Sequence, residues 1–207
     1  EENLVTGTEN TESSVLDSGN DEGTKSSELD SSASANQLEA AAMLAAEEAT
    51  PSVLYQTHVQ DYGWTEAVKD GITSGTIGEA KRLEGIRISL IDAPETGGIE
   101  YQAHVENIGW MGYVSDGQLA GTTGESKRLE AIRINLTGEL AGIYDIYYRV
   151  HSQNFGWLDW AKNGESAGTS GYGYRLEAIE IQLVKKDGTA PSPTTTAYME
   201  KGEGVSY

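Results

Sequence analysis

The chain contains three copies of one segment, at residues 55–90, 101–136 and 148–183. The copies align without gaps, and their Tyr, His, Gly-Trp, Gly-Thr and Arg-Leu-Glu positions recur at a spacing of about 46 residues. A repeat of this size cannot bury its own apolar face, so the copies must share one core. We name them repeats 1, 2 and 3. They predict a closed, pseudo-threefold domain, with a β-prism favoured and a β-trefoil as the alternative.

Each repeat carries two strand patterns and turn-forming dipeptides between them. The second pattern reads Ile-x-Ile-x-Leu in repeats 2 and 3, which predicts one face in the core. On this alternation Arg82 and Glu84 of repeat 1 share the core-side face with Ile86, and the equivalent pairs of repeats 2 and 3 do the same. Tight turns are expected at Asp70-Gly71, Asp116-Gly117 and Asn163-Gly164. One or two short strands fit between these turns and long helices do not, so the fold class is all-β.

The flanking segments differ in composition from the repeats. Residues 1–54 hold 12 acidic residues, one lysine and no aromatic residue. Such a segment buries too little apolar surface to fold, so we predict a disordered acidic linker over 1–52, within which 37–48 can form a short helix. The repeats form a domain over 53–185. Residues 186–207 begin with a Pro/Thr-rich stretch and are expected to be a linker, with the start of a following domain of a longer protein as the alternative for their end.

Composition excludes several classes of function. The net charge of −19 argues against nucleic acid as a partner, because phosphate binding needs a basic face. The absence of cysteine removes thiolate chemistry and Cys-ligated metal sites. No apolar run is long enough to span a bilayer. No phosphate-binding or dinucleotide-binding motif and no asymmetric pair of carboxylates is evident, so we expect neither a cofactor nor catalysis.

The repeat pattern resembles a known family. Tyr-x-x-His, Gly-Trp, Asp-Gly, Ala-Gly-Thr-x-Gly and Arg-Leu-Glu-Ala-Ile-x-Ile-x-Leu, which repeat 2 matches most fully, resemble the Clostridial hydrophobic repeat with a conserved tryptophan, the ChW repeat. The resemblance implies an extracellular module of a secreted or surface-attached protein of Gram-positive bacteria. It also implies binding to polysaccharides or to other proteins, without naming a ligand.

Two sets of aromatic residues are candidates for ligand contact. The tryptophan of each Gly-Trp pair is either a wedge between repeats or a stacking platform for a sugar ring. The residue three positions later differs between copies, being Ala67, Tyr113 and Trp160. A position that varies within a constant frame suggests specificity, and we expect Tyr113 and Trp160 to be exposed on a loop; the alternative is a permissive surface position. The ligand candidates are therefore Trp64, Trp110, Tyr113, Trp157 and Trp160.

Charged residues supply the polar candidates. Each repeat has an Arg-x-Glu pair that either contacts ligand hydroxyls or anchors the Gly-Thr loop. These pairs are Arg82/Glu84, Arg128/Glu130 and Arg175/Glu177. The three histidines are expected to be half-buried and bonded to backbone or a carboxylate, rather than to converge on a metal. The sequence thus predicts a non-catalytic module that binds a glycan, with a protein-binding adhesin or assembly module and a structural spacer as alternatives.

Overall fold

The structure, a computed structural model, describes residues 50–93 and 96–202. The predicted disordered linker and its short helix therefore lie almost entirely outside the described residues. The described part is built from strands and one short helix, α2 (Leu140–Ile143). The predicted all-β fold is confirmed.

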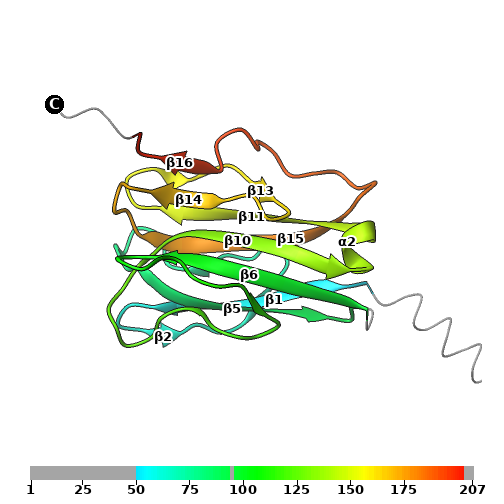
Figure 1. Cartoon of the computed structure of the whole chain (residues 1–207), viewed down its shortest axis with the longest axis horizontal. Coiled ribbons are helices and arrows are strands. Elements are labelled where there is room, and N and C mark those ends of the chain that lie inside the picture. The colour runs from blue at the N-terminus through cyan, green and yellow to red at the C-terminus, as the bar shows by residue number, and fades with distance from the viewer. Residues whose placement is uncertain (1–49, 94–95, 203–207) are drawn as a thin grey trace, which may run out of the picture. The chain divides into compact units, whose positions relative to one another are not determined.

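One long antiparallel hairpin forms the body of each repeat (Figure 1). In the hairpin strands, apolar side chains alternate with polar ones, so one face of each hairpin is buried. The paired long strands are β1 (Ser52–Val59) with β5 (Leu83–Ile91), β6 (Gly97–Val105) with β10 (Leu129–Gly138), and β11 (Tyr144–Ser152) with β15 (Leu176–Lys185).

Three short strands lie between the two long strands of every hairpin, where the sequence predicts one or two. In repeat 1 they are β2 (Gly63–Trp64), β3 (Val68–Lys69) and β4 (Ser74–Gly75). In repeat 2 they are β7 (Gly109–Trp110), β8 (Val114–Ser115) and β9 (Ala120–Gly121). In repeat 3 they are β12 (Gly156–Trp157), β13 (Ala161–Lys162) and β14 (Ala167–Ser170).

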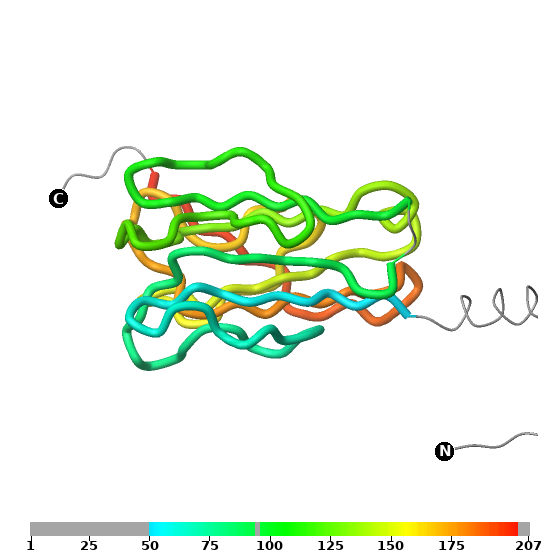
Figure 2. The backbone as a smooth tube through the Cα atoms, turned by 90° about the horizontal axis from the view of Figure 1, so that it is seen from below, coloured from blue at the N-terminus to red at the C-terminus, as the bar shows by residue number. Residues whose placement is uncertain are grey.

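The repeats close into a ring because each one lends a strand to another repeat. Strand β9 of repeat 2 pairs with β5 of repeat 1, and β14 of repeat 3 pairs with β10 of repeat 2. Strand β4 of repeat 1 pairs with β15 of repeat 3, which completes the circle. Segments far apart in sequence therefore lie side by side (Figure 2). The exchange explains why one repeat is insufficient, since every sheet is completed by a strand from another copy.

A glycine on each exchanged strand allows the close approach. The backbone φ angle is +116° at Gly75, +106° at Gly121 and +122° at Gly168, a region that disfavours side chains. A Cβ atom on Gly121 would lie 2.5 Å from the carbonyl oxygen of Glu84 in the neighbouring repeat. The Gly-Thr motif is therefore a contact between repeats, which the sequence describes only as a loop.

The repeated tyrosine bonds across the same boundary. The Tyr101 hydroxyl accepts a hydrogen bond from the backbone N–H of Ile88 in repeat 1, at 3.0 Å, and donates one to the carbonyl of Gln118. Tyr55 likewise accepts from the N–H of Ile181 in repeat 3, at 3.1 Å. Burial is the main cause that raises the pKa of both hydroxyls above the ordinary value of 10.0. Neutral, buried tyrosines thus link the repeats.

The core contains the predicted apolar triplets, but the Arg-x-Glu pair lies differently from the prediction. Ile86 and Ile88 are fully buried, and Leu90 packs against the core from its edge. At the entry to β5, Val59 pairs with Leu83 and His58 pairs with Gly85, so Glu84 is an extra residue in a β-bulge. The bulge reverses the alternation: Leu83 enters the core and Glu84 turns to the outer face.

The same bulge occurs in the other two repeats. In repeat 2 Val105 pairs with Leu129 and His104 with Ala131, which leaves Glu130 as the extra residue. The register shift between His151 and Ser152 leaves Glu177 unpaired in the same way in repeat 3. The prediction that the glutamates share the core-side face with the apolar triplets is therefore wrong at all three positions, Glu84, Glu130 and Glu177.

Part of the segment predicted as a C-terminal linker packs on repeat 3. Strand β16 (Tyr198–Glu200) pairs in parallel with the outer edge of β14 (Figure 1). The backbone N–H of Trp160 donates to the carbonyl of Pro193 at 3.0 Å, and Ala197 is buried. Repeat 3 consequently carries an extra strand that repeats 1 and 2 lack among the described residues.

Candidate functional site

The tryptophan of each Gly-Trp pair lies on the outer face of its hairpin. A tight turn precedes the tryptophan, and Trp64 pairs with His58 in a short strand that folds back on β1. The His58 ring meets the Trp64 ring edge-on, with centroids 5.4 Å apart. The Arg87 guanidinium lies over the indole, 4.5 Å from its centroid. Trp64 is thus half-buried and held between two side chains of its own repeat.

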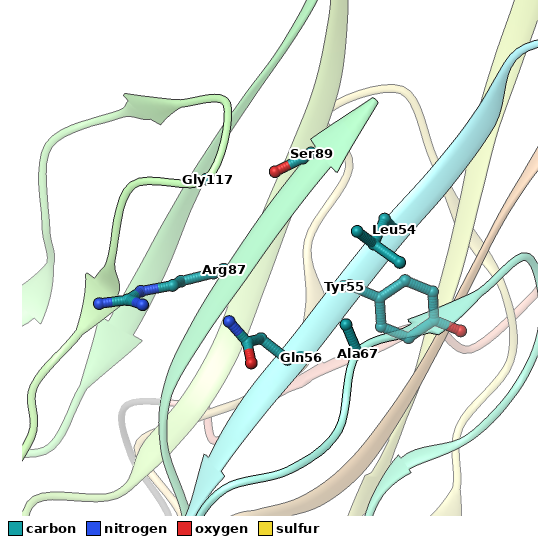
Figure 3. Close-up of a pocket in the computed structure, with 7 residues that line it drawn as sticks. All are labelled: Leu54, Tyr55, Gln56, Ala67, Arg87, Ser89 and Gly117. Atoms are coloured by element: carbon teal, nitrogen blue, oxygen red, sulfur yellow. The ribbon is translucent and has the colours of Figure 1, made fainter. Parts of the chain in front are cut away.

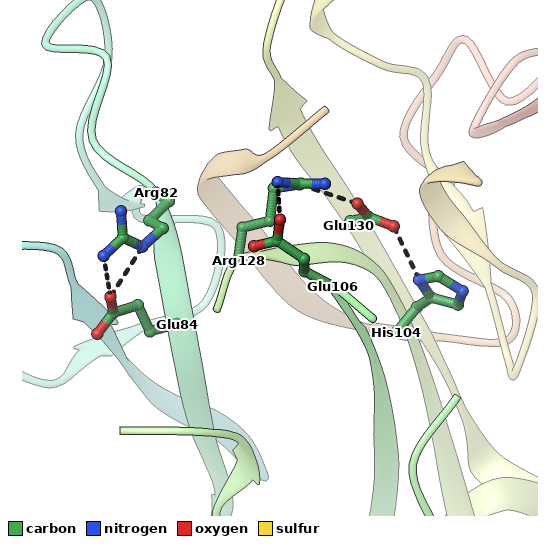
Figure 4. Close-up of polar contacts among 6 residues, drawn as sticks. All are labelled: Arg82, Glu84, His104, Glu106, Arg128 and Glu130. Atoms are coloured by element: carbon green, nitrogen blue, oxygen red, sulfur yellow. Dashed lines mark hydrogen bonds and ion pairs between the residues drawn. The ribbon is translucent and has the colours of Figure 1, made fainter. Parts of the chain in front are cut away.

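A buried carboxylate holds the histidine in place. Nδ1 of His58 lies 3.1 Å from Glu84 Oε2, without an aligned N–H···O hydrogen bond. The other carboxylate oxygen accepts from Arg82 Nε at 2.8 Å (Figure 4). In repeat 2, His104 Nδ1 lies 3.2 Å from Glu130 Oε2, and repeat 3 keeps the same arrangement. The histidines are half-buried and lie against a carboxylate, as expected, but the expected hydrogen bond to it stays a prediction.

The buried position of these carboxylates disagrees with the prediction that they contact ligand hydroxyls. Glu84, Glu130 and Glu177 are only 5%, 6% and 6% exposed. In repeat 2, one Glu130 oxygen accepts from Arg128 Nε at 2.9 Å and the other faces His104 (Figure 4). Both oxygens of each carboxylate are therefore occupied by side chains of the same repeat, and the glutamates are support for the histidine rather than an open sugar site. For Arg82, Arg128 and Arg175, contact with a ligand stays a prediction.

The bulge also joins this cluster to the neighbouring repeat. The backbone carbonyl of Glu84 accepts a hydrogen bond from the N–H of Thr122 in repeat 2, at 2.8 Å. The carbonyl of Glu177 likewise accepts from the N–H of Thr76, at 2.9 Å. The Arg-x-Glu pair therefore lies beside the junction between repeats. It is close to the Gly-Thr loop, which is the loop that the pair would anchor on the alternative interpretation.

Repeat 3 reaches the same tryptophan–arginine contact from the opposite strand. In repeats 1 and 2 a glutamine on the first hairpin strand faces an arginine on the second, Gln56 opposite Arg87 in repeat 1. In repeat 3 the pair is Arg149 opposite Glu180, joined by an ion pair of 2.7 Å. The Arg149 guanidinium lies 4.8 Å from the Trp157 centroid. Because the guanidinium is retained while its strand changes, its contact with the indole is a specific feature of the repeat.

The arginines over the tryptophans are residues that sequence reasoning missed. The alternation places Arg87 on the face opposite the core, which is correct, but no role follows from that alone. The sequence signal for this contact is that both positions change together between repeats. Repeat 1 has Gln56 and Arg87, and repeat 3 has Arg149 and Glu180 at the same positions. Cross-strand partners that change together in this way indicate a contact.

The variable position three residues after the tryptophan differs in structure as well as in sequence. Tyr113 is 49% exposed, as predicted. Trp160 is only 7% exposed, so the prediction of an exposed loop residue is wrong there. It packs against the Arg149 guanidinium, 4.8 Å from the ring centroid, and its backbone is bonded to the C-terminal segment. Nothing in the sequence indicates that this segment returns to repeat 3.

The small side chain of Ala67 leaves a pocket at this position in repeat 1 (Figure 3). The pocket has a volume of about 160 Å³ and opens on the outer face of β1 and β5. Its polar groups are the side chains of Gln56, Arg87 and Ser89, and the turn at Gly117 of repeat 2 forms one wall. The Arg87 guanidinium that lines it is the one stacked on Trp64. The pocket therefore combines hydrogen-bonding groups with an adjoining aromatic ring.

A cluster of three aromatic side chains lies at the loop tips of repeat 3. Phe155, which is 36% exposed, meets Tyr172 and Tyr174 with ring centroids 5.5 Å apart in each pair. In repeat 1 the positions of the two tyrosines hold Glu79 and Lys81. We call Phe155, Tyr172 and Tyr174 the aromatic cluster. It is a surface feature of one repeat, unlike the tryptophan sites.

A second charged cluster in repeat 3 surrounds Asp145. Burial alone would raise the pKa of Asp145, but hydrogen bonds from Lys186, Asn163 and Lys162 hold it well below its usual range. The carboxylate lies 2.8 Å from Lys186 Nζ and 3.0 Å from Lys162 Nζ. The buried charge of Asp145 is therefore compensated by its partners, and its ion pair with Lys186 joins the hairpin of repeat 3 to the segment that follows it.

The described residues show neither a metal site nor a helix that could span a membrane. Within 50–93 and 96–202, no group of three or more His, Asp or Glu side chains is arranged to hold a metal ion. Each histidine lies against its own glutamate instead. In the same part of the chain, no helix has the length and apolar character needed to cross a membrane.

Comparison with known proteins identifies the repeat. A family model described as Clostridial hydrophobic W (ChW) matches residues 58–92, 104–138 and 151–185, which together exceed half of the chain. The matches begin at the histidine of each repeat and include the Gly-Trp pair and the Arg-Leu-Glu motif. No curated protein and no solved structure matches the chain.

Proposed function

Because the chain belongs to the Clostridial hydrophobic W family, we propose that it is a non-catalytic binding module of a secreted or surface-attached bacterial protein, and that its ligand is a carbohydrate. The proposed site is the pocket of repeat 1. Its guanidinium and amide groups suit sugar hydroxyls, and the guanidinium is held in place by its stack on Trp64.

The variable position carries this proposal. The same position holds Ala67 in repeat 1, the partly exposed Tyr113 in repeat 2 and the buried Trp160 in repeat 3. The chain therefore contains an open version of one site beside versions in which an aromatic side chain stands at the same place. In repeat 1 the Arg82–Glu84 pair supports His58, which in turn holds Trp64 against the pocket.

The proposal is tested by filling the pocket with the chain's own alternatives. The full chain is screened against bacterial cell-wall and host glycans, and any hit is titrated against Ala67→Trp and Ala67→Tyr. We expect binding to be lost in both variants, because their side chains enter the space that the sugar needs. Tyr113→Ala is the matched control at the same position of repeat 2: it leaves the pocket of repeat 1 unchanged, so binding at that pocket should be retained.

Circular dichroism and thermal unfolding establish that every variant is folded. Saturable glycan binding that survives Ala67→Trp in a folded protein would contradict the assignment of the site. Absence of binding to every glycan would contradict the carbohydrate proposal as a whole.

The aromatic cluster favours a second candidate, a protein-binding adhesin or assembly module. A three-ring cluster that only repeat 3 carries resembles a contact patch more than a repeated sugar site. If this candidate is correct, Tyr172→Glu with Tyr174→Lys, which introduces the residues of repeat 1, abolishes capture of a surface-protein partner. Glycan binding by the Ala67 variants does not depend on the aromatic cluster, so the two experiments test the two candidate functions independently.

A further inference from the structure

The C-terminal segment shows how an extended peptide binds to the edge of an exchanged strand. The N–H of Gly168 on β14 donates to the carbonyl of Ala197 at 2.9 Å, and the N–H of Lys201 donates to the carbonyl of Ser170 at 3.0 Å. Before β16 begins, the N–H of Thr196 donates to Asp159 Oδ2 at 2.8 Å. Ala197 is buried by this pairing. The segment is thus an added strand with a carboxylate at its start.

Strand β4 of repeat 1 presents the equivalent edge without an added strand. It pairs with β15 on its inner side, and no described strand lies on its outer side. The N–H of Thr76 donates inward to the carbonyl of Glu177 at 2.9 Å. Since N–H groups alternate along a strand, the N–H of Gly75 points outward, as that of Gly168 does. The φ angles of these two glycines, +116° and +122°, are also alike.

Two exposed isoleucines distinguish this edge from its counterparts. Ile72 and Ile77 flank β4 and are 56% and 51% exposed, although the backbone of Ile72 is fixed by a hydrogen bond from the Tyr55 hydroxyl. The corresponding residues are Gln118 and Thr123 beside β9. An exposed apolar pair on a fixed, unpaired strand edge is a liability for a monomeric protein unless a partner covers it.

Repeat 1 also keeps the carboxylate that receives the added strand. Glu66 stands at the position of Asp159, whereas repeat 2 has Gly112 there. Repeat 1 therefore combines the open edge, the apolar flanks and the acceptor for a peptide N–H. Repeat 2 has the open edge alone.

We propose that the outer edge of β4 binds an extended segment of a partner protein, which adds a parallel strand as β16 does on β14. In the register of β16, where Tyr198 lies opposite Gly168, the segment carries a tyrosine-sized residue opposite Gly75. Its apolar side chains cover Ile72 and Ile77. Its leading N–H donates to Glu66. Glu66 adjoins Ala67 of the sugar pocket, but the proposal does not depend on glycan binding.

The test uses a fluorescently labelled peptide with the sequence of residues 194–201, Thr-Thr-Thr-Ala-Tyr-Met-Glu-Lys, added to the full chain. Fluorescence anisotropy gives the affinity, and protection of the Gly75 amide from hydrogen exchange locates the peptide. We expect saturable binding with protection at Gly75. The double variant Ile72→Gln/Ile77→Thr, which copies the residues of repeat 2, should bind at least about tenfold more weakly. Ile108→Thr, which removes another exposed isoleucine, should leave the affinity unchanged.

A peptide N-methylated at the residues corresponding to Thr196 and Lys201 provides the control on the ligand side. It keeps the side chains but lacks two N–H donors, so it should not bind. Equal binding of the methylated peptide would overturn strand addition in favour of non-specific apolar contact. Absence of binding by the unmodified peptide would overturn the proposal. So would self-association in sedimentation velocity that is abolished by Ile72→Gln/Ile77→Thr, because a second copy would then be the occupant.

Discussion

Replacing Gly121 by alanine should loosen the ring at one junction between repeats. The new Cβ atom would lie 2.5 Å from the Glu84 carbonyl oxygen and 2.9 Å from the Gly85 Cα atom, which are backbone atoms that can yield only if the strands separate. Strain at a φ of +106° costs about 1–3 kcal/mol and the steric clash about 1–3 kcal/mol more. We expect the free energy of unfolding to fall by about 2–6 kcal/mol, a large part of the roughly 5–15 kcal/mol typical of a domain.

The control is Gly109→Ala, at a glycine whose φ is +86° but whose Cβ would meet nothing within 4 Å. Only the strain applies there, so we expect a loss of about 1–3 kcal/mol. Urea unfolding followed by tryptophan fluorescence and by circular dichroism gives both values. Equal losses for the two variants would refute the reasoning, because the contact between repeats would then contribute nothing.

Two further predictions concern the tryptophan stack and the tyrosines. Arg149→Gln should lower the free energy of unfolding by about 1–3 kcal/mol, because Trp157 loses the guanidinium over its ring and Glu180 loses its ion-pair partner. The double variant Arg149→Gln/Glu180→Arg recreates the arrangement of repeats 1 and 2, and it should recover most of that loss in denaturant unfolding. Folding raises the pKa of Tyr55, Tyr101 and Tyr148 above 10.0, so their contribution to stability is complete below pH 10 and is lost as the pH rises through their pKa values in the folded protein. In an alkaline titration followed at 295 nm, these three tyrosines should ionise only when the protein unfolds. Their ionisation in the folded protein would contradict the buried tyrosine hydrogen bonds between repeats.

The sequence predicts the architecture well because repetition and alternation are local signals. The three copies, the all-β class and the buried triplet around Ile86 follow from spacing alone. The exchange of strands does not, since nothing in the Gly-Thr motif says which repeat its backbone touches. The β-bulge at Glu84, Glu130 and Glu177 could not be predicted either. The extra residue moves the preceding side chains to the other face of the strand, and it is recognised only from the pairing with the first strand.

The candidate site is predicted less completely for a similar physical reason. Trp64 and its equivalents are visible as repeated residues, but the guanidinium above each ring is recognised only when cross-strand partners are known. The burial of Trp160 depends on residues 193–201 returning to repeat 3, a tertiary contact. The open pocket appears only when Ala67 is compared with the packing of Trp160.

The stoichiometry of glycan binding tests the central claim most directly, namely that the ring displays three versions of one site and that the version in repeat 1 binds. Isothermal titration of the full chain with a glycan identified by the screen should give one site per chain, located by the loss of heat in Ala67→Trp. Three equivalent sites that persist in Ala67→Trp would contradict the account, since Trp64, Trp110 and Trp157 would then act as independent platforms.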